Sequence, residues 1–509
     1  MRKLCLVMAL AAPLGMMAQK AVNPTPFANT ITAEDLKKHL YIVAGAEMQG
    51  RETATEGQRK AATYIENYFK QVGLTPGNNG AWQQSYPVYQ DSLGSASIEI
   101  NGKKFQPYTD FTANLGGSSS SSLMASEVVF VGYGISDANR DDYKGIDAKG
   151  KVVLVLAGAP PAAGQPAAAP RRGGMSPVLE AAFKNGAVAV LQVQPGFPRK
   201  AGSTRGYQYI NGFRKTIYPN VYAVSEQVAQ SILGADFAPA QEAMKAGNPQ
   251  AKAYAANIAI DFQKVITKLE SSNVVGVLEG TDKKDEYVFL TAHYDHVGVN
   301  AAGQIHYGAD DDGSGTVTIL ELAEAFIKAK AAGKGPRRTI VFMTVSGEEK
   351  GLWGSEYYSE HPIFPLDKTT VDLNIDMIGR IDPTRKIGDS TNYVYVVGDD
   401  KLSSDLRIIS EAANKKYTKL ELDYKFNDPN DKERIYYRSD HYNFARKGVP
   451  IIFYFNGTHA DYHRPTDTPD KIDYVQMAKR AKLVFYTAWE MANRNDMLKR
   501  DIPLNVPGR

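Results

Sequence analysis

The sequence predicts an α/β protein whose mixed, mostly parallel sheet is flanked by helices. In the second half of the chain, apolar runs of strand length alternate with longer stretches of helical periodicity, a pattern typical of a parallel sheet covered on both faces. Histidines and carboxylates follow several of these runs, where open α/β sheets bind ligands. The chain has 509 residues, more than one compact core holds, so we expect two or three domains.

Residues 1–19 have the layout of a secretory signal peptide. Arg2 and Lys3 precede an apolar run, which is too short for an ordinary transmembrane helix. The only cysteine is Cys5, so the chain after cleavage would contain neither a disulfide nor a thiol catalyst. We therefore expect an exported protein, periplasmic or extracellular, with no other membrane span. Lys and Arg number 59 and Asp and Glu 56, a balance that gives no reason to expect a nucleic-acid partner.

The segment that follows predicts two helices and then β-hairpins. Thr32 with Asp35 is typical of a capping box at a helix start. A second helical pattern spans residues 61–72, and Gly73 suits its C-terminal cap. Residues 82–114 alternate apolar and polar side chains, as strands of hairpins do. We interpret the serine run 118–122 as a linker.

The middle block, residues 121–262, differs in sequence pattern from the segments before and after it, and it carries no cluster of acids, bases or metal ligands. A loop rich in Pro, Ala and Gly interrupts it at residues 158–174, and a second domain boundary is expected near residues 255–272. Predicted strands cover residues 128–135, 150–156 and 187–191, and predicted helices cover residues 177–183 and 226–233.

The third region supplies the strand–helix alternation and contains no internal repeat. Its apolar runs are typical of buried strands, and each helical stretch is long enough to cross over the sheet. Predicted strands cover residues 287–292, 339–345, 371–377, 393–397 and 449–455, and predicted helices cover residues 316–330, 402–416 and 474–493.

Candidate catalytic groups lie at or after strand ends of this region. Glu348 and Glu349 follow one buried strand, and Asp376 lies at the end of another, where an unpaired charge would be costly. His293 and Asp295 follow a third strand with a spacing that places both on one side of an extended chain. Asp310, Asp311 and Asp312 repel one another unless a cation compensates, and His463 lies in a later turn.

This mix of two imidazoles and several carboxylates suits zinc or a similar divalent ion. The three consecutive Asp residues do not match an EF-hand calcium loop, because its alternating ligands and terminal Glu are absent. One bridging Asp could hold two metal ions about 3.5–4 Å apart. Such a pair lowers the pKa of water and polarises a carbonyl, and a nearby Glu can then accept the proton.

The chain resembles the co-catalytic dizinc exopeptidase family, which includes bacterial leucyl-type aminopeptidases and glutamate carboxypeptidase-like enzymes. The stretches that carry the resemblance are GRETATEG (50–57), HYDH (293–296), GADDDGSG (308–315), SGEEKGLWGS (346–355), NIDMIGR (374–380), RSDHYNFARKGVP (438–450) and YHRPTDTPDKID (462–473).

The resemblance implies a role for each matched residue. His293 and Asp376 would bind one zinc ion, Glu349 and His463 the other, and Asp311 would bridge the two. Glu348 would be the general base that activates the bridging water, and Asp295 would orient His293. Asp440 and His441 would support the pocket. Some of the remaining candidates would either contact the ligands or be structural (His296, Asp310, Asp312 and His459), and the others would be structural (His39, His306 and His361).

The resemblance also implies the domain organisation. Residues 20–120 and 263–509 would form the peptidase domain, with the zinc exopeptidase fold. Residues 121–262 resemble the smaller, β-rich protease-associated (PA) domain that some members carry as an insertion, a lid or access module without catalytic residues. The motifs behind this second likeness are VVFVGYGI (128–135) and GIDAKGKVVLVL (145–156).

We therefore expect an exported zinc aminopeptidase that releases N-terminal residues from peptides. A carboxypeptidase stays open, because it needs a cationic clamp and Arg438, Arg446 and Arg464 are available. A glutaminyl cyclase-like acyltransferase on the same fold is a second alternative, with one zinc ion rather than two. A receptor-like protein without activity is disfavoured, because all five ligands and Glu348 are present.

Overall fold

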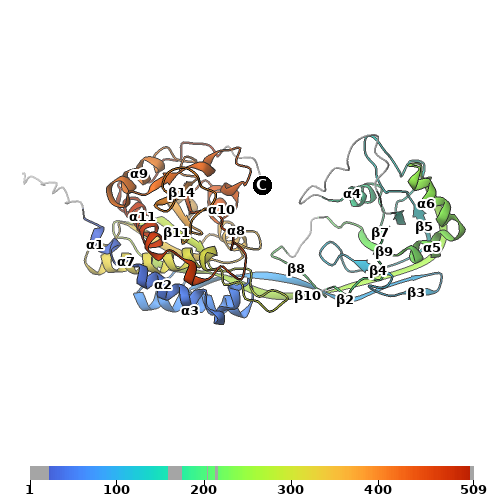
Figure 1. Cartoon of the computed structure of the whole chain (residues 1–509), viewed down its shortest axis with the longest axis horizontal. Helices are drawn as coiled ribbons and strands as arrows, with labels where there is room; N and C mark the ends of the chain where they lie inside the picture. The colour runs from blue at the N-terminus through green and yellow to red at the C-terminus, as the bar shows by residue number, and fades with distance from the viewer. Residues whose placement is uncertain (1–21, 157, 159–174, 203, 212–215, 505–509) are drawn as a thin grey trace, which may run out of the picture. The chain divides into compact units, whose positions relative to one another are not determined.

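The computed structural model describes residues 22–156, 158, 175–202, 204–211 and 216–504. The predicted signal peptide and most of the loop at 158–174 lie outside the described residues. The chain forms two compact units: Met1–Tyr86 with Ser271–Arg509, and Pro87–Glu270, here called unit 1 and unit 2 (Figure 1). Within the described part of the chain, no helix combines the length and apolar character needed to cross a membrane.

Unit 1 contains a mixed, mostly parallel sheet with strand order β15-β14-β16-β13-β11-β12-β10. The inner strands β16, β13, β11 and β12 are parallel to one another, whereas β14 and β10 are antiparallel to their inner neighbours. The strands are β1 (Thr75–Pro76), β11 (Lys283–His293), β12 (Arg338–Val345), β13 (Thr369–Ile375), β14 (Tyr393–Val397), β15 (Glu421–Asp423), β16 (Ile451–Phe455) and the C-terminal part of β10 (Lys252–Leu278).

Helices cover both faces of this sheet because successive strand residues point to opposite sides. Val288 and Leu290 of β11 pack with α2, α3, α7 and α11, whereas Phe289 packs with α8 and α10 on the other face. Figure 1 shows α2 and α3 beside α7. The helices are α1 (Thr25–Ala28), α2 (Ala33–Val43), α3 (Glu56–Val72), α7 (Gly315–Ala331), α8 (Trp353–Glu360), α9 (Leu406–Ala413), α10 (His441–Ala445) and α11 (Tyr474–Asn493).

The predicted helix caps are confirmed. The Thr32 hydroxyl accepts a hydrogen bond from the Asp35 amide at 3.1 Å and fixes the start of α2. Gly73 ends α3 with φ +96°, a left-handed conformation that glycine adopts at no steric cost.

The predicted strands and helices of the third region are present, and α11 has the predicted bounds. The helix expected at 402–416 begins later, at Leu406, and ends at Ala413, where a π-helix continues over Asn414–Thr418.

Unit 2 has its own smaller sheet, with strand order β10-β5-β6-β7-β9-β4 and a parallel centre. Two apolar clusters, one on each face, form its core. Its elements are β2 (Gln83–Ile100), β3 (Lys103–Phe105), β4 (Phe111–Ala113), β5 (Ser121–Phe130), β6 (Val152–Leu156), β7 (Ala189–Val193), β8 (Arg205–Tyr209), β9 (Asn220–Val224), α4 (Pro177–Lys184), α5 (Glu226–Leu233), α6 (Phe237–Lys245) and the N-terminal part of β10.

The domain boundaries differ from those expected at residues 120 and 262. Residues 87–120 belong to unit 2, because Ile98, Ile100 and Phe105 pack into its core. The end of the serine run is not a linker, since Ser121 and Ser122 pair with β10. The second boundary lies between Glu270 and Ser271, within the range 255–272 expected for it, and it falls inside β10, one long strand that pairs with β5 first and with β12 afterwards. The chain thus passes between the units inside β2 and β10.

Candidate metal centre

The carboxyl ends of the parallel strands in unit 1 bring the predicted ligands together. His293 is the last residue of β11, Asp376 directly follows β13, and Glu349 follows β12. Asp311 lies in the turn before α7, and His463 lies in the loop after β16. Residues scattered over the sequence therefore meet at one edge of the sheet, as the parallel topology requires.

Asp311 is the centre of this cluster. Its Oδ1 atom is 3.3 Å from His293 Nε2, and its Oδ2 atom is 3.0 Å from His463 Nε2. His463 Nε2 is also 3.0 Å from Glu349 Oε2, and His293 Nε2 is 3.6 Å from Asp376 Oδ1. One carboxylate thus lies between two imidazole–carboxylate pairs, the arrangement expected of a bridging ligand.

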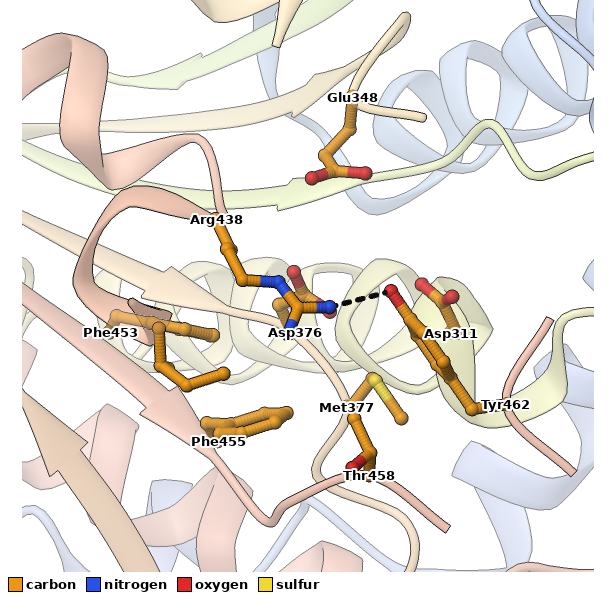
Figure 2. A pocket seen from close by; sticks show the side chains of 10 residues that line it. Asp311, Glu348, Asp376, Met377, Arg438, Phe453, Phe455, Thr458 and Tyr462 are labelled. Atoms are coloured by element: carbon orange, nitrogen blue, oxygen red, sulfur yellow. Dashed lines mark hydrogen bonds between the residues drawn. The ribbon is translucent and has the colours of Figure 1, made fainter. Parts of the chain in front are cut away.

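Glu348 lies beside this cluster without being part of it. Its Oε2 atom is 3.9 Å from His293 Nε2. Figure 2 shows its carboxylate directed into a cavity that Asp311 and Asp376 also line. A carboxylate that faces the ligands across a cavity can exchange protons with a molecule bound there.

The donor atoms fit a divalent cation. Within the described residues, the buried atoms His293 Nε2, Asp311 Oδ2 and Glu349 Oε1 have no hydrogen-bond partner of good geometry, despite their close neighbours. Buried polar atoms left in this way call for an explanation, and an ion is a common one. Imidazole nitrogens and carboxylate oxygens are the ligands that zinc accepts. We conclude that these residues can hold zinc.

Comparisons with known proteins agree with this geometry. Residues 273–488 match Peptidase family M28, and this range contains all five predicted ligands and Glu348. Residues 273–488 belong to peptidase family M28. We therefore call unit 1 the M28 unit.

Similar proteins with curated names include fungal ones. The chain is 32% identical over 217 residues to a "Probable leucine aminopeptidase" of Trichophyton verrucosum, covering 41% of this chain and 55% of that protein. It is 30% identical over 239 residues to one of Arthroderma otae, covering 46% and 61% respectively. The chain thus spans little more than half the length of these relatives.

Two solved structures share the fold across nearly the whole chain. An aminopeptidase from Aneurinibacillus sp. strain AM-1 has a TM-score of 0.53 at 20% identity, covering 96% of this chain and all of that one. A zinc aminopeptidase from Bacillus subtilis has a TM-score of 0.50 at 20% identity, covering 93% and 99% respectively. These likenesses confirm the α/β fold with its mostly parallel sheet.

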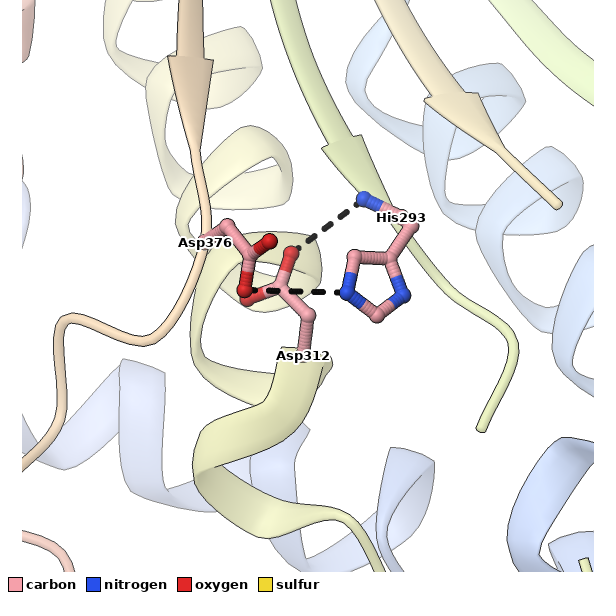
Figure 3. Close-up of side chains that lie close together, drawn as sticks. All are labelled: His293, Asp312 and Asp376. Atoms are coloured by element: carbon pink, nitrogen blue, oxygen red, sulfur yellow. Dashed lines mark hydrogen bonds and ion pairs between the residues drawn. The ribbon is translucent and has the colours of Figure 1, made fainter. Parts of the chain in front are cut away.

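Asp312 and His296 lie directly beside the predicted metal ligands. Asp312 forms a potential ligand group with His293 and Asp376, as Figure 3 shows, and His296 forms another with Asp311 and Glu349. The two carboxylate oxygens of Asp312 already accept three backbone amides, those of residues 293, 315 and 377. Its role is therefore to hold the ligand loops in place.

His296 is a different case. Its Nδ1 atom is 2.8 Å from Glu349 Oε1 and 3.8 Å from Asp311 Oδ2, and its ring is fully buried. This imidazole can fix the orientation of the Glu349 carboxylate. Its place in the HYDH motif, three residues after His293, is the only signal in the sequence that could have indicated it.

Asp295 contacts His293 through its backbone. The carbonyl oxygen of Asp295 is 3.1 Å from His293 Nδ1, whereas its carboxylate Oδ1 is farther away, at 3.7 Å. The carboxylate instead accepts hydrogen bonds from the Thr53 hydroxyl at 2.6 Å and from the Glu348 amide at 3.2 Å. Asp295 thus links the imidazole to the loop that carries Glu348.

The pKa values of two acids in the metal centre, Asp311 and Glu348, are shifted in opposite directions. Burial opposes ionisation of Asp311, but the imidazoles of His293 and His463 hold the pKa of this carboxyl well below its ordinary value. Burial raises the pKa of Glu348 well above its ordinary value, and the negative charges of Glu349 and Asp376 add to the rise. The Asp311 carboxylate therefore stays ionised, whereas Glu348 holds a proton more readily, as a general base that must later return it should.

Arg51 explains the GRETATEG motif of the N-terminal segment. Its fully buried guanidinium donates hydrogen bonds to the carbonyl oxygens of Val43, Tyr294, Tyr307 and Gly308, at 2.7–2.9 Å. One side chain thus ties the end of α2 to two of the segments that carry metal ligands, the one after β11 and the one before α7. The sequence alone indicated the motif but not this function.

Asp440 and His441, expected to support the pocket, are both buried. His441 Nε2 donates to the Tyr436 carbonyl at 2.8 Å, and its ring stacks on Phe453, a residue of the cavity. Burial lowers the pKa of His441 to about 3. The imidazole is therefore neutral in the folded protein across the physiological range.

We expect Arg51→Met to lower the thermal unfolding midpoint by about 5 °C or more, because four buried carbonyl groups lose their donors. Its zinc content should fall as well, since two ligand-carrying segments lose their anchor. Calorimetry and metal analysis check this. Arg59→Met is the control, because exposed Arg59 makes one long hydrogen bond, to Ala54. Equal midpoints for the two variants would refute the role of Arg51.

We expect His441 to make the M28 unit sensitive to acid. In the unfolded chain this imidazole takes up a proton near its ordinary pKa of 6.5, whereas burial in the folded protein delays protonation until about pH 3. Stability is therefore present above pH 6.5 and is lost as the pH falls, by about 2 kcal/mol between pH 7 and 5. Urea unfolding at both pH values should show a smaller loss for His441→Gln than for the wild type. The exposed-site variant His361→Gln should keep the wild-type loss.

Proposed function

We propose that this protein is an exported zinc-dependent aminopeptidase that hydrolyses N-terminal residues from peptides. The observation that carries the proposal is the cavity in which Glu348 faces Asp311 and Asp376. The family match of residues 273–488 and the aminopeptidase names of the fungal relatives support it. Export rests on the signal-like sequence of residues 1–19.

The proposed mechanism assigns the metal ions to two ligand sets. His293 and Asp376 would hold one, Glu349 and His463 the other, and Asp311 both, supported by the distances within the cluster. When bound, the two zinc ions would supply an acidified water molecule and a Lewis acid for the peptide carbonyl. Asp295 and His296 would orient ligand side chains and the Glu348 loop.

Glu348 would move the proton. Its raised pKa suits a group that accepts a proton from the attacking water and delivers it to the nitrogen of the departing peptide. The inner wall of the cavity is apolar, formed by Met377, Ile435, Phe453 and Phe455. Such a wall favours an apolar side chain on the residue that is released.

We also propose that unit 2 includes a protease-associated domain without catalytic residues. Support comes from the strand motifs at 128–135 and 145–156. Both groups of potential metal ligands found among the described residues lie in unit 1.

We expect Glu348→Gln to lower kcat for Leu-p-nitroanilide by at least about a thousandfold, because the amide cannot accept the proton. Its zinc content should equal that of the wild type, since Glu348 is not among the proposed ligands. Glu360→Gln, an exposed acid on α8, is the control and should keep wild-type turnover. Unchanged turnover of Glu348→Gln would refute the role.

We expect two zinc ions per chain in the purified protein and about one in His463→Ala, which removes a ligand of one ion only. Inductively coupled plasma mass spectrometry checks the stoichiometry, with His361→Ala as a matched control at an exposed histidine. One zinc ion in the wild type would contradict the bridging role of Asp311. It would favour a mononuclear acyltransferase on this fold.

A further inference from the structure

We propose that Arg434 and Arg438 form a binding site for a carboxylate that the substrate carries on the residue after the hydrolysed bond. This inference rests on the proposed exopeptidase function and adds a substrate class to it. The carboxylate has two possible sources: the free C-terminus of a dipeptide, or the side chain of an acidic second residue.

Two cavities meet at the candidate base. The inner cavity, about 30 Å³, is the one described above with apolar side chains on one wall, and the outer groove, about 390 Å³, is lined by Glu349, Leu352, Arg434 and Tyr437 among others. Glu348, Arg438 and Tyr462 line both of them. Figure 2 shows the Arg438 guanidinium hydrogen-bonded to the Tyr462 hydroxyl, in the cavity that Glu348 and Asp376 also line. A substrate at Glu348 therefore meets Arg438 on its way from one cavity to the other.

Neither guanidinium forms an ion pair with a carboxylate of the described residues. Arg438 donates one hydrogen bond, to the Tyr462 hydroxyl at 3.2 Å, and Arg434 lies 4.7 Å from the centre of the Tyr437 ring. Among the residues that the structure describes, no carboxylate oxygen lies within 4.0 Å of either group; the ion pairs of unit 1 involve other cations, such as Arg380 with Asp461 at 3.1 Å. Two unpaired guanidinium groups in one groove offer a planar, bidentate site that matches a carboxylate.

The surrounding charges make this arrangement selective. Glu348 and Glu349 line the same groove and would repel a substrate carboxylate. Arg434 and Arg438 offset that repulsion, so an anionic substrate gains more from them than a neutral one does. The guanidinium groups are thus suited to discrimination between charged and uncharged substrates.

The position of Glu348 decides which residue carries the carboxylate. The hydrolysed bond must lie at Glu348, between the two cavities. The apolar wall of the inner cavity suits the side chain of the released residue, so the remainder of the substrate enters the larger groove with the arginines. The geometry therefore favours an apolar first residue and a carboxylate on the second.

The test compares kcat/KM for matched substrates with the zinc-loaded full-length protein. Leu-Ala against Leu-Ala-amide measures the effect of a free C-terminus, and Leu-Glu-amide against Leu-Gln-amide measures that of an acidic side chain. We expect a preference of about tenfold or more for the anionic member of at least one pair, the size that a charged hydrogen bond gives. The pair that shows it identifies the source of the carboxylate.

The variants assign the preference to the two arginines. In Arg434→Ala/Arg438→Ala the ratio should fall to within about twofold of one, and Arg438→Lys should keep part of it, because the charge remains but the bidentate fork is lost. Arg446→Ala is the control: this arginine lies outside both cavities, 3.8 Å from Glu356, and its loss should leave the ratio unchanged.

Three results would overturn the inference. They are a wild-type ratio near one for both pairs, a ratio that persists in the double variant, and faster hydrolysis of Glu-Ala-amide than of Leu-Ala-amide, which would place the carboxylate on the first residue. All three require that some substrate is hydrolysed. If the zinc-loaded protein hydrolyses none of them, the proposed function fails instead.

Discussion

The position of Asp311 between His293 and His463 is the constraint on which the rest of the M28 unit depends. A carboxylate that contacts two imidazoles from distant parts of the sequence has to be held against repulsion from its acidic neighbours. The fold reduces this repulsion because the carboxylates of the two neighbours, Asp310 and Asp312, interact with other groups. Asp310 accepts the Gly379 amide and lies 3.2 Å from His459, Asp312 accepts backbone amides, and only Asp311 keeps an oxygen without a good hydrogen-bond donor.

The supports of this cluster are mostly backbone contacts of buried side chains. Arg51 and Arg480 each donate to several carbonyl oxygens around the site, and Asp467 accepts the amides of Asp310 and Asp311. Such contacts fix the course of loops, whatever the side chains of those loops are. The catalytic loops can therefore differ in sequence while their positions are kept, which is consistent with a shared fold at 20% identity.

Much of this architecture follows from local patterns. Apolar runs and caps predicted the strands and helices of the M28 unit. Strands buried on both faces require continuous apolar residues, and helix termini require capping residues, so both can be recognised in the sequence. Residue types at strand ends predicted a divalent-ion site, and the family resemblance implied the five ligands and the role of Glu348. The anchoring role of Arg51 could not, since its acceptors are backbone carbonyls, which every residue possesses. The first unit boundary was also missed, because it falls inside the continuous strand β2 and not in a loop.

The insertion of unit 2 between Tyr86 and Ser271 has a consequence for biosynthesis. Helices α2 and α3 leave the ribosome early, yet Leu40 and Phe69 pack against elements that are made much later, among them α7 and α11. Unit 2 is complete in the nascent chain before those elements exist, so it can acquire its structure first. During that interval the apolar faces of α2 and α3 lack their partners. A nascent chain of this kind is a natural client for chaperones that shield exposed helices until translation ends.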